Sequence, residues 1–210
     1  MGGNPFAGFP LVLRSPYLLG ISLFVILLAS VNTFLYFEQL RLVTETFSNV
    51  EDRTRVFARL DYIVQALAII TQVFITGRLA SRLGTTVLLT VVPIAMVIGF
   101  TTLSFYGTFW VLAFVFIARR AGEYAFIRPG REMLFSRVST ESKYKAKNLI
   151  DVPVYRGGDA LSAQVKAALE GGGLHPAGAA LLGAGLAGLW ALNGWWLGRR
   201  YRRGGTDVIP

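Results

Sequence analysis

The chain has 210 residues, of which 53% are hydrophobic and only 16% are charged, with a formal net charge of +9. Soluble domains carry about 25% charged residues, so this composition predicts an integral membrane protein whose solvent is the lipid bilayer. The absence of cysteine excludes disulfides, thiolate catalysis and cysteine-ligated zinc. With His175 as the single histidine, no metal cluster or Ser/His/Asp set is expected. An enzyme is therefore the least favoured class, and no cofactor is expected.

Six apolar segments predict six transmembrane helices, because roughly 20 residues at about 1.5 Å each cross a hydrocarbon core of about 30 Å. The segments are, in chain order, 17–37, 62–75, 85–105, 108–126, 148–169 and 177–197. The fourth and fifth carry charged residues within the apolar run, whereas the first and third carry none. The connection at about 39–60 is amphipathic and is expected to be an outside loop.

The distribution of basic residues predicts the orientation of the chain. With six spans and both termini cytoplasmic, thirteen basic residues lie inside and four lie in outside loops, as the positive-inside rule expects. The predicted organisation is a cytoplasmic segment (1–15), a six-helix transmembrane domain (16–198) and a basic cytoplasmic tail (199–210). A short interfacial helix at about 128–146 is expected to be a membrane anchor or a vestibule that attracts phosphate.

Charged side chains inside the fourth span point to a function, since a charge at the bilayer centre costs about 2.5–3.5 kcal/mol on insertion scales. Arg119 and Glu123 are four residues apart, which places them on one helix face where they can pair. Arg120 and Tyr124 share a neighbouring face by the same spacing. These groups are expected to face the protein interior rather than lipid.

The fifth span carries a second charged face. Asp151, Tyr155 and Asp159 repeat every four residues, and Arg156 lies three residues before Asp159. In a regular α-helix these four groups occupy an arc of about 140°, which is expected to meet a water-filled cavity, a partner helix or a substrate. The glycine pair at 157–158 allows either close helix packing or a bend.

Lys166 and Glu170 lie near the outer end of the fifth span, where long side chains are expected to reach the membrane surface. "GAGLAG" at 183–188 matches a dinucleotide-binding pattern, but it lies within an apolar span. We therefore interpret it as small-residue helix packing.

"GRLASRLG" at 77–84 ends the second span and resembles the inter-helix loop motif of the major facilitator superfamily, Gly-x-Leu-Ala-Asp-Arg-x-Gly. Gly77, Arg82 and Gly84 match that motif, which implies a gating role for them, while Ser81 stands where the motif has aspartate. A simple basic turn is the alternative interpretation.

The region 119–161, "RRAGEYAFIRPGREMLFSRVSTESKYKAKNLIDVPVYRGGDAL", resembles bacterial members of the ATP:ADP antiporter family, and "FLYFEQ" at 34–39 fits the same family. The resemblance implies an all-α integral protein of the bacterial inner membrane, corresponding to the C-terminal six-helix half of a major-facilitator-like transporter. It also implies a partner in the form of a second six-helix half, as a separate chain or a second copy. The expected ligand is an anionic small molecule and not a nucleic acid polymer.

The first functional hypothesis is exchange of an anionic phosphorylated solute, such as ATP for ADP, by alternating access. The residues expected to bind phosphate oxygens are Arg119, Arg120 and Arg156. Those expected to stack on a base are Tyr124 and Tyr155. Those expected to hold the arginines in the empty state are Glu123, Asp151 and Asp159.

A static interhelical ion pair is the alternative role for each arginine. At the level of the whole protein, the alternative is a membrane scaffold or assembly subunit that derives from a half-transporter and does not transport.

Overall fold

The computed structural model describes residues 8–71 and 76–203, without the side chains of 76–82 and of Glu141. Over this part the chain is all-helical, as the sequence predicts. The elements are α1 (Gly8–Arg14), α2 (Pro16–Thr46), α3 (Val50–Ile70), α4 (Thr76–Phe105), α5 (Phe109–Gly122), η2 (Glu123–Ile127), α6 (Arg128–Phe135), α7 (Thr140–Leu149), η3 (Ile150–Val154), α8 (Tyr155–Gly171) and α9 (Pro176–Arg203). The elements η2 and η3 are π-helical turns.

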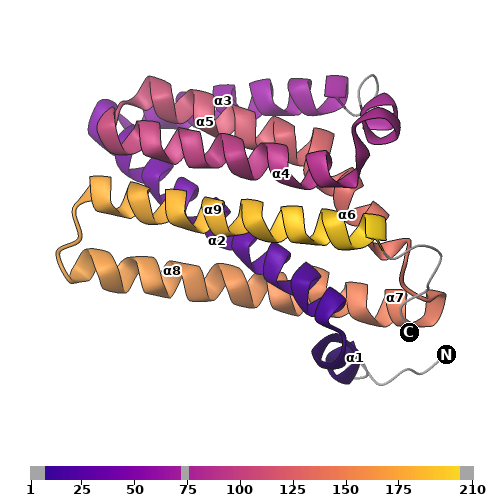
Figure 1. Ribbon diagram of the computed structural model, residues 1–210. Helices are drawn as coiled ribbons and strands as arrows, with labels where there is room; N and C mark the ends of the chain where they lie inside the picture. Colours follow the sequence, from indigo (N-terminus) through magenta and orange to yellow (C-terminus); the bar gives the residue numbers. More distant parts are fainter. Residues whose placement is uncertain (1–7, 72–75, 204–210) are drawn as a thin grey trace.

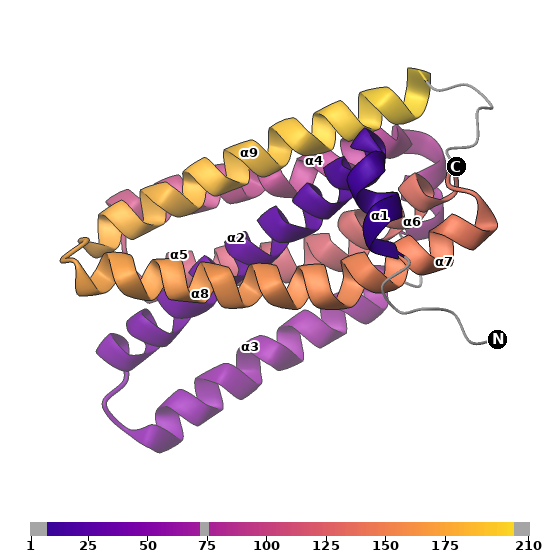
Figure 2. The same cartoon turned by 90° about the horizontal axis from the view of Figure 1, so that it is seen from below.

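The long helices form a bundle around α2, which crosses it obliquely (Figure 1). On one side α9 packs along α4 and α2, and on another α8 packs against α2. A second view shows α3 at the edge of the bundle, splayed away from α9 (Figure 2). The helices α5, η2 and α6 follow one another without a break, as do α7, η3 and α8.

The centre of the bundle is apolar and well packed. Phe24 of α2 and Trp190 of α9 are fully buried, with ring centroids 5.5 Å apart. The buried hydroxyl groups of Ser22 and Ser30 donate to carbonyl oxygens four residues earlier on α2. This local bonding lets polar side chains enter the core without an unsatisfied donor.

Three helices are long and apolar enough to cross a membrane: Pro16–Thr46, Leu83–Phe105 and Pro176–Arg203. They contain the first, third and sixth predicted spans, and they indicate a multi-pass membrane protein. Of the second predicted span, 62–70 lies in α3, and 72–75 lie outside the described residues. The fourth lies in α5 and η2 apart from Thr108, and the fifth runs from the end of α7 through η3 into α8. These shorter or more polar helices do not meet the same criterion among the described residues, so the count of six spans stays a prediction.

The predicted outside loop at 39–60 is wrong. Helix α2 continues to Thr46 and α3 begins at Val50, so only 47–49 connects them. Arg41 explains the extension, because it pairs with Glu38 at 2.7 Å and with Glu45 at 3.0 Å along the same helix. Ion pairs at these spacings stabilise a helix beyond the end of its apolar run.

The single interfacial helix predicted at 128–146 is also wrong, because 136–139 separates α6 from α7. The apolar side of α6 faces the bundle rather than a membrane surface, and Leu134 and Phe135 are fully buried. The hydroxyl of Tyr17 donates to the carbonyl oxygen of Leu134 at 3.0 Å, which ties α6 to the start of α2.

Candidate functional site

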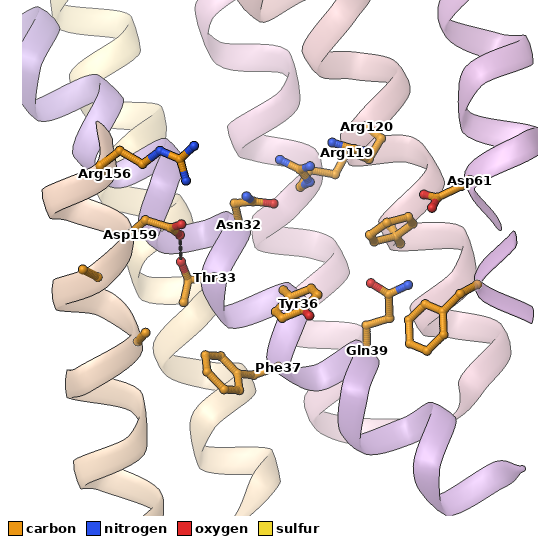
Figure 3. Close-up of a pocket in the computed structure, with 14 residues that line it drawn as sticks. Asn32, Thr33, Tyr36, Phe37, Gln39, Asp61, Arg119, Arg120, Arg156 and Asp159 are labelled. Atoms are coloured by element: carbon orange, nitrogen blue, oxygen red, sulfur yellow. Dashed lines mark hydrogen bonds between the residues drawn. The ribbon is translucent and has the colours of Figure 1, made fainter. Parts of the chain in front are cut away.

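A polar pocket of about 730 Å³ lies between α2, α3, α5 and α8. Its lining residues are Asn32, Thr33, Tyr36, Phe37 and Gln39 of α2; Phe57 and Asp61 of α3; Phe116, Arg119 and Arg120 of α5; and Arg156, Asp159, Ala160 and Ala163 of α8. The pocket therefore brings together the three arginines predicted from the fourth and fifth spans. Figure 3 shows Arg119 and Arg120 side by side on α5, with Arg156 entering from α8.

Arg119 is the most deeply buried of the three arginines, with a side-chain exposure of 2%. Its Nη1 donates to Oε2 of Glu123 at 3.2 Å, so the pairing predicted from their spacing is confirmed. The other oxygen of Glu123 lies 3.8 Å from Nη2 of Arg128. Glu123 thus stands between two cations, one in the pocket and one outside it.

Arg120 and Arg156 make no ion pair with any carboxylate among the described side chains. The guanidinium of Arg120 lies 6.0 Å from the ring centroid of Phe116, and Arg156 is exposed on the pocket wall. The Nε atoms of Arg119 and Arg120 are buried and lack a hydrogen-bond partner within the same part of the chain. Buried donors of this kind are normally satisfied, so these guanidinium groups have spare capacity for an anion.

The two aspartates of the fifth span point to different helices. Asp159 accepts a hydrogen bond from the hydroxyl of Thr33, which joins α8 to α2 inside the pocket (Figure 3). Asp151 instead pairs with Arg131 of α6 and lies outside the pocket. The charged face predicted for Asp151, Tyr155 and Asp159 assumes a regular α-helix. Asp151 lies in the π-helical turn η3, so the regular α-helical spacing does not hold at this position.

The two tyrosines predicted to stack on a base do not line the pocket. The ring of Tyr124 lies under the guanidinium of Arg128, at 4.1 Å from its centroid. The hydroxyl of Tyr155 accepts a hydrogen bond from the amide of Asn32 at 3.4 Å, so Tyr155 supports a lining residue from behind. The pocket takes its aromatic surface from four residues that the sequence analysis did not select: Tyr36, Phe37, Phe57 and Phe116.

The glycines of the predicted motifs have distinct roles. Gly84 has φ = 72° and divides α4 at the start of its apolar span, a backbone conformation that a residue with a side chain rarely adopts. The side chain of Arg82 and the surroundings of Gly77 lie outside the described part of the chain. Gly158 packs against Ile26 of α2 within a continuous helix, so close packing rather than a bend explains it.

Comparisons with protein families, with curated proteins and with solved structures found no match to this chain. The resemblance to the ATP:ADP antiporter family therefore stays a prediction from the motifs in 119–161 and 34–39. Fold and site together define a helical membrane protein with an arginine-lined polar pocket.

Proposed function

We propose that the chain is part of a membrane transporter for an anionic, phosphorylated solute, with a nucleotide of the ATP/ADP type as the first candidate. The observation that carries the proposal is the pocket that Arg119, Arg120 and Arg156 line from two helices, two of them without a carboxylate partner in the described structure. Charged groups in a membrane protein are costly to keep, and they commonly mark a ligand pathway.

The composition of the pocket suits this class of ligand. A planar guanidinium can hold two phosphate oxygens at once, so three of them favour a ligand with more than one negative charge. The aromatic side chains of Tyr36, Phe37 and Phe57 offer flat surfaces on which a base can stack. A volume of about 730 Å³ falls in the range of about 300–1,000 Å³ typical of small-molecule sites.

Glu123 supplies a mechanism for coupling binding to movement. It holds Arg119, while Arg128 lies 3.8 Å from its second oxygen. An anion that binds Arg119 competes with Glu123, which can then transfer its contact to Arg128 at the start of α6. A ligand that changes the partner of a buried charge in this way favours one helix arrangement over another.

The wider proposal follows the motif resemblance. The chain would be the six-helix C-terminal half of a major-facilitator-like transporter in a bacterial inner membrane, with both termini cytoplasmic and alternating access as the mechanism. Ligand sites of such transporters lie between two halves, so the pocket would be completed by a separate six-helix half or by a second copy of this chain.

Two measurements test the proposal: binding of ATP, ADP and inorganic phosphate to the purified chain, and uptake of the same labelled compounds by proteoliposomes. Arg156→Gln and Arg120→Gln are each expected to weaken binding at least about tenfold, since a charge-assisted bond is removed without disturbing an ion pair. Arg59→Gln is the matched control, because Arg59 is exposed on α3 and does not line the pocket.

If the Arg156→Gln and wild-type proteins bind these anions equally well, the assignment of the pocket as the binding site is wrong. Binding without uptake would indicate a missing second half, which addition of a candidate partner to the proteoliposomes should supply. If neither binding nor uptake is observed, the scaffold alternative is favoured.

A further inference from the structure

A second cationic recess lies at the C-terminal end of α9, away from the polar pocket. It has a volume of about 460 Å³ and is lined by Trp195, Trp196, Arg199, Arg200 and Arg203. The guanidinium of Arg199 lies 4.0 Å from the ring centroid of Trp195, and that of Arg200 lies 5.2 Å from that of Trp196. None of the three arginines pairs with a carboxylate in the ranges that the structure describes.

An apolar groove of about 590 Å³ adjoins this recess, between α2 and α9. Its lining residues are Pro16, Leu19, Gly20, Leu23, Leu27, Leu189, Leu192, Asn193 and Trp196. Trp196 belongs to both the groove and the recess. Its indole packs on Gly20, where a Cβ would lie only 2.5 Å from the ring. One side chain thus joins a strongly cationic surface to a strongly apolar one.

We propose that recess and groove together form a binding site for an anionic phospholipid. The three arginines would hold the phosphate and the remaining negative charge of the headgroup, and an acyl chain would lie along the leucines of the groove. Four of those leucines, Leu19, Leu23, Leu189 and Leu192, are exposed in the isolated chain.

The position of the site in the sequence supports a lipid as the occupant. Helix α9 is one of the three helices able to cross a membrane, and its last turn holds Arg200, Arg202 and Arg203. The arginines therefore lie where the span ends, at the depth of the headgroups. Tryptophan favours the same depth, because its ring is apolar and its N–H is polar. A free phosphate ion would use the recess but would leave the groove empty.

This site shares no lining residue with the pocket between α2, α3, α5 and α8. The inference therefore does not depend on transport. A protein that never moves a solute can still bind a lipid at the end of α9.

Native mass spectrometry of the full chain in detergent tests the proposal. Phosphatidylglycerol and phosphatidylcholine with identical acyl chains are added at equal concentration, and the bound fraction is measured. The expected result is at least about tenfold stronger retention of phosphatidylglycerol, since each arginine near an anionic headgroup contributes. The triple variant Arg199→Gln/Arg200→Gln/Arg203→Gln should retain the two lipids equally. Arg202→Gln, on the same turn but outside the recess, should behave as the wild type.

A second variant separates the groove from the recess. Leu23→Trp places a large ring in the groove and is expected to weaken retention of both lipids by a similar factor, without changing their ratio. If the triple variant does not fold, as judged by gel filtration, the single variants Arg199→Gln and Arg200→Gln should each reduce the preference by about threefold.

Three results would overturn the proposal. The first is equal retention of the two lipids by the wild type. The second is a loss in Arg202→Gln as large as that in the triple variant, which would indicate unspecific attraction. The third is complete displacement of phosphatidylglycerol by millimolar inorganic phosphate, which would assign the recess to free phosphate.

Discussion

Lys166 of α8 and Glu38 of α2 face each other with side-chain exposures of only 2% and 3%, and Nζ lies 3.9 Å from Oε1. The second oxygen of Glu38 is held by Arg41 at 2.7 Å, and Lys166 bonds directly to Glu170. The ring of Phe37 lies 5.1 Å from Nζ. The prediction that Lys166 reaches the membrane surface is therefore wrong, because the side chain turns inward to a buried carboxylate.

Lys166→Met is expected to destabilise the fold by about 3 kcal/mol, because it leaves the carboxylate of Glu38 buried with one cation fewer. The double variant Lys166→Met/Glu38→Gln should recover part of that loss, since no uncompensated charge then remains buried. Reversible denaturation in mixed micelles measures both changes. Arg55→Met is the control: its side chain is 66% exposed, so the change should stay below about 0.5 kcal/mol. A double variant less stable than Lys166→Met would contradict the prediction.

The contact between α4 and α9 depends on glycine at Gly194, where a Cβ would lie 2.5 Å from the carbonyl oxygen of Leu89. Gly194→Ala is expected to lower the free energy of unfolding by about 1–3 kcal/mol, because the two backbones must separate. Gly185→Ala on the same helix meets no atom within 4 Å and should be neutral or slightly stabilising. Thermal unfolding of the two variants in the same detergent makes the comparison, and equal midpoints would disprove close packing at Gly194.

Arg131 and Asp151 join α6 to η3, and a double-mutant cycle measures their coupling energy. Both side chains are partly buried, so we expect about 1–3 kcal/mol for the cycle of Arg131→Gln and Asp151→Asn. The neighbouring pair of Lys147 and Glu132 is more exposed and should give less than about 1 kcal/mol. A larger coupling energy for Lys147 and Glu132 than for Arg131 and Asp151 would contradict the prediction. It would mean that the exposed pair holds α6 to α7.

The pocket arginines should separate into a structural and a binding class. Arg119→Gln leaves Glu123 without its buried partner and is expected to reduce stability by about 2 kcal/mol. Arg156→Gln breaks no described ion pair and should change stability by less than about 0.5 kcal/mol while weakening anion binding. Unfolding midpoints and ligand titrations on both variants test the division. If Arg156→Gln is the less stable variant, its proposed role as a free ligand-binding cation is wrong.

The sequence predicts the helical class and most helices correctly, because long apolar runs leave few alternatives in a membrane. It fails where charges extend a helix beyond its apolar run. The pairs that Arg41 makes with Glu38 and Glu45 continue α2 into the segment predicted as a loop. The hydropathy of a segment does not reveal which charged side chains pair along a helix.

Helix spacing predicts one contact of the candidate site correctly and does not predict the contacts between helices. Arg119 and Glu123 pair as their spacing requires. Asp151 does not join Asp159 in the pocket, because it pairs with Arg131 of α6, a contact between two helices that spacing along one helix does not predict. The contribution of α3 through Phe57 and Asp61 could not be predicted, since contacts between distant helices depend on tertiary packing. The run "FLYFEQ" did offer a signal for Tyr36 and Phe37, because aromatic residues there directly precede two polar ones within an apolar span.

The two wide turns have a consequence for how this chain can tolerate a change in length. Each of η2 and η3 closes its hydrogen bonds over five residues, where a regular turn closes them over four. Deleting one residue from η2 or η3 would restore regular α-helical geometry, and the helix would stay continuous. The two flanking stretches would keep nearly the same rotation about the helix axis, because four residues in a regular turn cover about the same angle as five in the wide turn. A shortened chain would therefore keep Arg119 and Arg131, or Asp151 and Asp159, close to their present directions.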